Sequence, residues 1–139
     1  MFASRRFAGE FSARIKPGAA WEVSMKISLD QILARIPGVP TSKWPEGDRY
    51  ATALAHGSMS VGLYMPLGRD PQTPHSQDEI YIVRSGSAQF SVQGERRPCN
   101  TGDVLFVGAG VEHRFDSLSA DFSAWVVFWG PKGGEQAPI

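Results

Sequence analysis

Cysteine, net charge and long hydrophobic runs are all scarce in this 139-residue sequence. The single cysteine, Cys99, cannot form an intramolecular disulfide, which is typical of a reducing compartment, so we expect a cytoplasmic protein. The 14 basic and 14 acidic residues cancel, which argues against nucleic acid or an acidic membrane surface as the main partner. No apolar run approaches the roughly 18 residues that a membrane-spanning helix needs.

Glycine and proline are plentiful, and their 15 and 10 copies indicate many turns and short strands. The length predicts one domain, with a core large enough to fold without a metal or a disulfide. We expect four segments along the chain. They are a flexible, arginine-rich N-terminal extension over 1–24, a short helix and loop over 25–48, a β-barrel over 49–131, and a flexible tail over 132–139.

One helix is predicted, over residues 28–36. Ser28 and Gln31 have the spacing of a capping box, and Pro37 should end the helix. Apolar residues recur on one face, at Leu29, Ile32, Leu33 and Ile36. A helix this short needs support, so we expect this face to pack against a sheet.

From Tyr50 onward the hydrophobic period changes to two, and the pattern favours a β-sandwich or barrel of short strands. Strands are predicted at 50–55, 60–65, 80–84, 88–92, 104–107, 113–117 and 123–129. The strands near 80–83 and 125–129 are apolar on both faces, so both faces need cover. The helix could cover one outer face and a second subunit another, and we therefore expect a homodimer.

Two histidines and a glutamate stand at the ends of predicted strands. His75 lies just before the strand that starts near Glu79, and His113 follows the turn 108–110, whose glycines give the backbone freedom. Two imidazoles and a carboxylate suit a divalent metal such as Fe, Mn, Ni or Zn. We hypothesise that these three side chains converge on one metal ion inside the barrel. The alternative is two histidines satisfied by hydrogen bonds in the core and a solvated carboxylate at a strand end.

Tyr81 shares the face of Glu79 and should point into the barrel. It is our candidate catalytic residue as a substrate contact, and a core tyrosine with a satisfied hydroxyl is the alternative. We expect Asp78 to face solvent rather than bind metal, and His56 to be a surface histidine in a glycine turn. Cys99 has no histidine near it in sequence and is not a candidate nucleophile.

Two segments of the chain resemble the paired motifs of the cupin superfamily. The first motif reads Gly, five residues, His-x-His, three or four residues, Glu, six residues, Gly, and the matching positions are Thr73, His75, Glu79 and Gly86. The second reads Gly, five residues, Pro-x-Gly, two residues, His, three residues, Asn, and the matching positions are Gly102, Gly108, Gly110, His113 and Ser117. The resemblance covers roughly residues 50–130. It implies an all-β fold, a double-stranded β-helix (jelly-roll) barrel of the cupin type.

The resemblance also implies a function, a metal-dependent enzyme with oxygenase- or isomerase-like activity on a small organic molecule. The implied metal ligands are His75, Glu79 and His113. The sequence departs from the motifs at Thr73, which replaces the first histidine ligand, and at Gly108, which replaces a proline. A fourth ligand could be water or one of Gln72, Gln77, Asp78 and His56. Because Thr73 is a poor ligand, a small-ligand or metal-binding module without turnover is the alternative, and a barrel with a vestigial pocket is the third.

Overall fold

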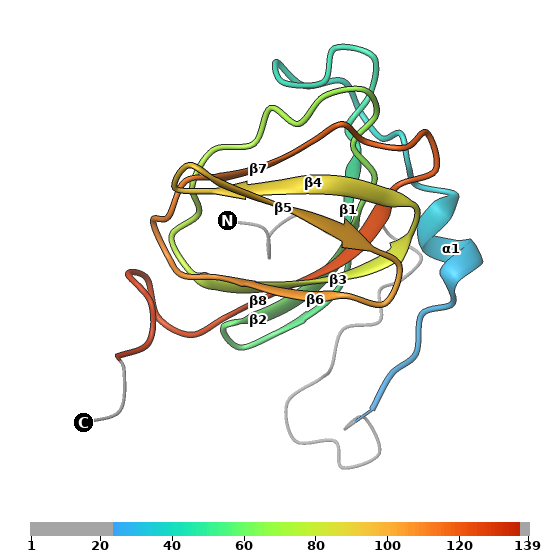
Figure 1. The fold of residues 1–139 in the computed structure, drawn as a ribbon. Helices are drawn as coiled ribbons and strands as arrows, with labels where there is room; N and C mark the ends of the chain where they lie inside the picture. The colour runs from blue at the N-terminus through green and yellow to red at the C-terminus, as the bar shows by residue number, and fades with distance from the viewer. Residues whose placement is uncertain (1–23, 137–139) are drawn as a thin grey trace.

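The computed structural model describes residues 24–136, which form two antiparallel β-sheets and one short helix (Figure 1). The elements are α1 (Leu29–Leu33), β1 (Tyr50–His56), β2 (Met59–Tyr64), β3 (Asp78–Ser85), β4 (Ser87–Val92), β5 (Glu95–Asn100), β6 (Val104–Val107), β7 (His113–Asp116) and β8 (Ser123–Trp129). The five-stranded sheet has the order β1-β2-β8-β3-β6, and the three-stranded sheet has the order β5-β4-β7. Figure 1 shows the smaller sheet running above β3, β6 and β8, so that the two inner faces enclose a barrel. The predicted all-β jelly roll with a short N-terminal helix is confirmed.

Each of the seven predicted strands is present, with ends within two residues of the prediction. One further strand, β5, was not predicted. Its sequence is mostly polar and exposed, and it contains Pro98, which pairs with Gln89 of β4. Because β5 lies at the edge of its sheet, the missing N–H of a proline need not remove a ladder hydrogen bond.

Helix α1 begins as the sequence predicts and ends earlier. The Ser28 hydroxyl accepts a hydrogen bond from the Gln31 backbone N–H at 3.1 Å, and the Gln31 side chain accepts one from the Ser28 N–H at 2.8 Å. The predicted end at Ile36 is wrong. The N–H groups of residues 35 and 36 donate to carbonyls three residues back, so the last turn tightens and the α-helix stops at Leu33.

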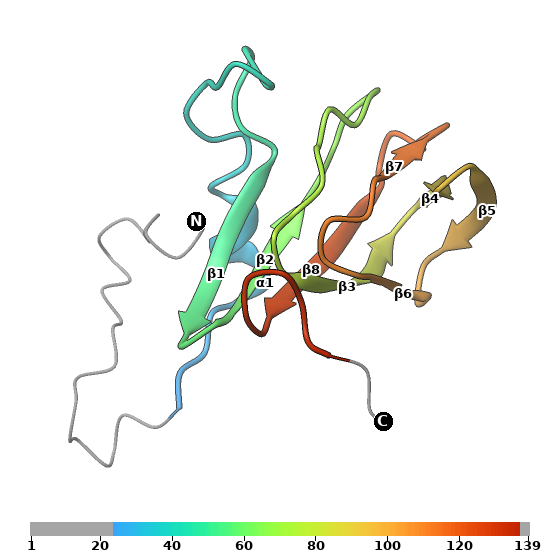
Figure 2. The same ribbon diagram turned by 90° about the vertical axis from the view of Figure 1, so that its left-hand side faces the viewer.

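The hydrophobic core has two parts. The larger part fills the barrel and is rich in aromatic rings, including Tyr81, Phe90, Phe115, Phe122 and Phe128. The smaller part joins α1 to the outer side of the large sheet, through Ile32, Ala51, Ala53, Leu63 and Trp125. Figure 2 shows α1 behind β1 and β2, so the helix covers one outer face as the sequence predicts.

The outer face of β3 and β6 has no such cover within the described chain. Ile82 lies opposite Val104 in the strand pairing, and Ile80 lies opposite Phe106. Val104 is 64% exposed and Phe106 is 63% exposed, and the Phe106 ring lies 6.2 Å from that of Trp129. These residues, Ile80, Ile82, Val104, Phe106 and Trp129, form an apolar surface that we call the β3–β6 face.

Asp78 is buried, so the expectation that it faces solvent is wrong. Its two carboxylate oxygens accept hydrogen bonds from the Ala109 N–H at 2.9 Å and from the Glu135 N–H at 2.8 Å. The Gly133 N–H also donates to the Ser76 carbonyl at 2.7 Å. The described part of the expected tail, residues 132–136, is therefore tied to the start of β3.

The expected N-terminal extension, residues 1–24, lies outside the described residues except for Ser24. The division of the chain into four segments stays a prediction. Within residues 24–136, no helix is long and apolar enough to cross a membrane.

Candidate metal centre

The side chains of His75, Glu79 and His113 meet at one point inside the barrel. One potential ligand atom of each lies within 4.8 Å of the others. Oε1 of Glu79 is 3.2 Å from Nε2 of His113 and 3.8 Å from Nε2 of His75. His75 lies in the loop before β3, Glu79 in β3 of the large sheet, and His113 at the start of β7 in the small sheet. The structure thus brings together the three residues that the sequence singles out.

The turn between β6 and β7 holds His113 near His75. Gly110 has a φ of +78°, which favours glycine, and its N–H donates to the His75 carbonyl at 2.7 Å. Asp78 fixes the same turn through its bond to Ala109. The backbone of the loop that carries one histidine is therefore bonded to the turn that delivers the other.

A backbone carbonyl sets the tautomer of His113. Its Nδ1 lies 2.8 Å from the Val111 oxygen, which can only accept, so Nδ1 carries a hydrogen. Nε2 is left facing Glu79 and the Tyr81 hydroxyl. Histidines that bind metals usually donate their second ring N–H in this way.

Glu79 places a carboxylate in the core, where it is only 1% exposed. Its Oε2 atom has no hydrogen-bond partner among the described residues. A buried carboxylate with an unpartnered oxygen is costly, and a bound cation would offset that cost. The set of two imidazoles and one carboxylate fits a divalent transition metal.

The two histidines differ in their pKa shifts. Burial lowers the pKa of His113, but the hydrogen bond with Glu79 and further favourable interactions outweigh it, and the pKa is raised. Without metal, Glu79 therefore favours the protonated form of His113. Burial is the largest cause of the lowered pKa of His75. His75 is therefore neutral near neutral pH, and neutral imidazole is the form that binds metals.

Tyr81 points into the barrel beside this cluster. Its hydroxyl donates to Gln72 Oε1 at 2.8 Å and lies 3.0 Å from His113 Nε2. Burial, followed by the charge of Glu79, raises the pKa of Tyr81 well above its ordinary value. The phenol therefore stays protonated near neutral pH and acts as a hydrogen-bond donor.

Gln72 is the fifth polar residue of the centre. Its Oε1 accepts from Tyr81 and lies 3.1 Å from His75 Nε2, while its Nε2 donates to Asp70 Oδ2 at 2.6 Å. Buried Asp70 also accepts from the Phe115 N–H at 2.8 Å, so it holds the Gln72 amide with its oxygen toward the site. The sequence reasoning missed Asp70.

The other candidates for a fourth ligand lie elsewhere. The Gln77 amide donates to the carbonyls of Ser58 and Gly130, and Asp78 holds the β6–β7 turn. His56 is exposed at the end of β1, as expected. Thr73 is also exposed, and its hydroxyl accepts from the Lys43 ammonium at 3.1 Å.

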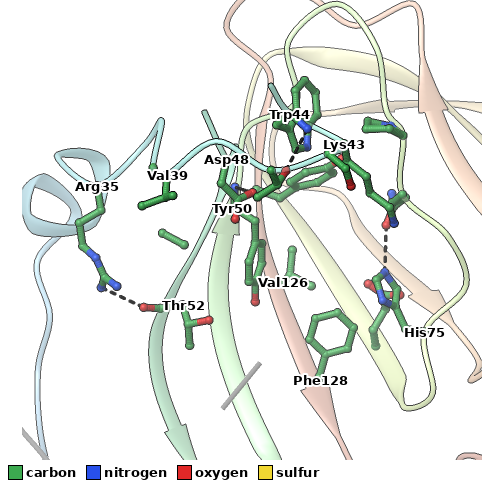
Figure 3. Close-up of a pocket in the computed structure, with 18 of the residues that line it drawn as sticks. Arg35, Val39, Lys43, Trp44, Asp48, Tyr50, Thr52, His75, Val126 and Phe128 are labelled. Atoms are coloured by element: carbon green, nitrogen blue, oxygen red, sulfur yellow. Dashed lines mark hydrogen bonds and ion pairs between the residues drawn. The ribbon is translucent and has the colours of Figure 1, made fainter. Parts of the chain in front are cut away.

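A cavity of about 690 Å³ adjoins the cluster, lined by His75, Glu79 and Tyr81 among others (Figure 3). Trp44, Val126 and Phe128 provide apolar wall, and Tyr50 and Thr52 provide polar groups. Much of the wall comes from residues 35–52, and the sequence analysis singled out no binding residue there. The loop before β1 has no periodic pattern, so nothing in the sequence marks it as cavity wall.

Comparison with known proteins agrees with this architecture. Residues 61–129 match the family described as "Cupin domain". An uncharacterized protein from Streptomyces coelicolor is 44% identical over 85 residues, which cover 60% of this chain and 81% of that protein.

Two solved structures give the same fold. A Cupin 2 conserved barrel domain protein from Salinispora arenicola has a TM-score of 0.52 at 22% identity, covering 58% of this chain and 74% of that one. The DMSP lyase DddQ from Ruegeria pomeroyi has a TM-score of 0.53 at 29% identity, covering 66% of this chain and 51% of that one. With its jelly-roll barrel, its paired motifs and these matches, the chain belongs to the cupin superfamily.

Proposed function

We propose that this protein is a metal-dependent cupin enzyme that acts on a small organic molecule. In this proposal, His75, Glu79 and His113 bind a divalent ion of Fe, Mn, Ni or Zn. One observation carries the proposal. The buried carboxylate of Glu79 has an oxygen without a hydrogen-bond partner and faces two imidazoles beside a cavity of about 690 Å³. A cavity of this size suits a small organic ligand.

The metal would supply Lewis-acid chemistry. The residues around it would bind and orient the substrate. Tyr81 is the proposed catalytic residue, because its protonated hydroxyl lies at the cluster and can donate to a substrate oxygen. The Tyr81 ring packs edge-on against Phe115 at 4.9 Å, which fixes its direction. Gln72, held by Asp70, would keep the hydroxyl in place.

The reaction class is a finer part of the proposal. Oxygenase- or isomerase-like reactions use a metal centre with open positions of this kind, and three protein ligands leave such positions. A lyase reaction is a further candidate, because the 29% identical structure from Ruegeria pomeroyi is a DMSP lyase.

A module that binds a metal or a small ligand without turnover is the second candidate. It is favoured by Thr73, which stands where the family motif has a histidine and whose hydroxyl contacts Lys43. A threonine at this position removes one strong ligand and would weaken metal binding.

We further propose that the protein is a cytoplasmic homodimer formed through the β3–β6 face. The exposed Val104 and Phe106 support an interface, because an apolar patch on a sheet face marks a contact site. The strand pairing places these side chains opposite Ile82 and Ile80, so the patch is continuous across two strands.

Metal content tests the central proposal. The protein would be purified without a histidine tag from metal-supplemented medium, and its metals measured by plasma mass spectrometry. We expect near-stoichiometric Fe, Mn, Ni or Zn in the wild type. In His75→Ala and His113→Ala we expect the metal content to be at least about tenfold lower, because each variant lacks one ligand. His56→Ala is the matched control, because His56 is an exposed histidine outside the site.

The His56→Ala protein should keep its metal. Trace metal in the wild type, or an amount that neither site variant changes, would contradict the metal centre. The barrel would then be a metal-free binding module.

A further inference from the structure

We propose that Lys43 recognises a carboxylate on the molecule that the cavity binds, so that the substrate class is a small organic carboxylate. This inference deepens the function proposed above. It rests on that proposal for one point, that the end of the ligand away from the carboxylate faces the metal centre.

Lys43 lines the cavity together with Trp44 and His75 (Figure 3). Its ammonium donates to a neutral hydroxyl, Thr73 Oγ1, at 3.1 Å. Within residues 24–136, no ion pair includes Lys43. The cavity wall therefore carries a cation whose charge is not neutralised by a neighbouring carboxylate.

The backbone under Lys43 is held in place. Its carbonyl accepts a hydrogen bond from the Arg69 guanidinium at 2.6 Å. The same guanidinium lies 4.4 Å from the ring centre of Trp44, which is buried, and the backbone N–H of Trp44 donates to the Thr41 hydroxyl at 2.9 Å. A cation presented by a fixed loop loses less entropy on binding a ligand.

The charges that line the cavity favour an anion once a metal is bound. Arg35 and Lys43 are the lining cations, and Asp48 and Glu79 are the lining carboxylates. Their formal charges cancel, so a divalent ion at the centre would make the cavity net positive. Lys43 and the proposed ligands His75 and Glu79 line the same cavity.

The donors near Lys43 suit a carboxylate. An ammonium has three N–H donors, so Lys43 can donate to a carboxylate while it donates to Thr73 Oγ1. The rest of the wall is mostly apolar, with Trp44, Val126 and Phe128 available to the carbon skeleton. The inferred ligand thus has a carboxylate at one end and a short carbon chain that reaches toward Glu79.

The test compares hexanoate with hexanamide, its neutral amide, by isothermal titration calorimetry. Both are titrated into the full chain, once loaded with zinc and once freed of zinc with EDTA, because a carboxylate can also bind the zinc itself. The variants are Lys43→Gln and Lys43→Arg. Lys132→Gln is the matched control, because it removes a lysine that does not line the cavity. Lys43 is exposed, so its substitution leaves the core intact.

We expect the wild type to bind hexanoate about tenfold more tightly than hexanamide, since a charge-assisted hydrogen bond of ordinary strength gives such a ratio. Lys43→Gln should abolish the preference in the zinc-free protein and reduce it in the zinc-loaded protein, where the zinc itself can bind the carboxylate. Lys43→Arg should retain most of it, and Lys132→Gln should retain all of it.

Three results would overturn the assignment of Lys43. They are no binding of hexanoate at millimolar concentration, equal affinity for the two probes, and a preference that survives in zinc-free Lys43→Gln. Failure of the metal proposal would look different. The wild type would then lose its zinc on dialysis, while the zinc-free protein would still show a preference that depends on Lys43.

Discussion

Glu79 carries its charge in one of the most buried positions of the barrel. Its Oε1 lies 3.2 Å from Nε2 of His113, and although burial lowers the pKa of His113, this contact contributes to its net rise. His75 has the opposite shift, because burial lowers its pKa. The pKa values of the two histidines are therefore shifted in opposite directions, although both face the same carboxylate.

The pair of His113 and Glu79 predicts how the stability of the metal-free protein depends on pH. Protonated His113 stabilises the fold fully below the ordinary histidine pKa of about 6.5, and this contribution is lost as the pH rises through the raised pKa of the folded state. We expect the difference in free energy of unfolding between the wild type and Glu79→Gln to be largest below about pH 6.5 and to shrink above it.

Urea unfolding in EDTA at a series of pH values measures this difference, because the Glu79→Gln reference largely cancels the opposite contribution of His75. Glu95→Gln is the control, since Glu95 pairs with Arg97 on the exposed surface and should give a small, nearly constant difference. A Glu79 difference that grows with pH would contradict the pairing.

The sequence predicts the positions of single residues well where they stand at strand ends. His75, Glu79 and His113 were predicted to meet because turns and strands place them at one end of the barrel. Asp78 was assigned wrongly, because its partners Ala109 and Glu135 lie 31 and 57 positions later in the chain. A local pattern carries no information on contacts at that range.

Among the elements, β2 depends on a glycine at its centre. A Cβ atom on Gly62 would clash with the ring and hydroxyl of Tyr50 on the paired strand β1 and would lie 2.8 Å from the Ala51 carbonyl oxygen. The backbone of Gly62 is ordinary, so the constraint is the space beside it. Tyr50 lines the cavity, and this glycine therefore sets how its side chain can lie.

We expect Gly62→Ala to lower the free energy of unfolding by about 2 kcal/mol, because overpacking forces Tyr50 or the β1 backbone to move. Urea denaturation measures the change. Gly108→Ala is the control, since a Cβ there would make only ordinary contacts, the nearest at 3.8 Å from Val111. Equal stability of Gly62→Ala and the wild type would show that β1 and β2 can separate without cost.

Elements with one buried face were predicted from sequence, and those without one were not. Strands such as β4 alternate between core and outer face and give a clear signal of period two. In β5 only Cys99 is buried, so there is no alternation to detect, and the strand exists because β4 offers it a partner edge. The end of α1 was also missed. Pro37 shows where helical structure must end, but not that the last turn before it has hydrogen bonds to carbonyls three residues back.

For the whole molecule, the β3–β6 face predicts the state of association. We expect the wild type to be a dimer at micromolar concentration and Phe106→Glu to be a monomer, because a charge at the centre of an apolar interface is costly to bury. Size-exclusion chromatography with light scattering measures the mass. Leu67→Glu is the control, since Leu67 is 51% exposed and lies outside this face. A wild type that remains monomeric at high micromolar concentration would contradict the dimer.

The barrel as a whole follows from the spacing of turns and strands, which is why the jelly roll could be predicted. The division of the strands into sheets of five and three could not be, because pairs such as β2 with β8 join distant parts of the chain. The cavity wall from residues 35–52 was missed for the same reason.

The metal centre and much of the cavity wall come from different stretches of the chain. The three proposed ligands lie between residues 75 and 113, whereas Lys43, Trp44, Asp48 and Tyr50 come from the segment that precedes the second strand. Mutations in that earlier segment can therefore change which molecule is accepted while the reactive groups stay in place. Such a separation lets one barrel diversify its choice of ligand by gradual change, and it marks residues 38–48 as the natural target for directed evolution of specificity.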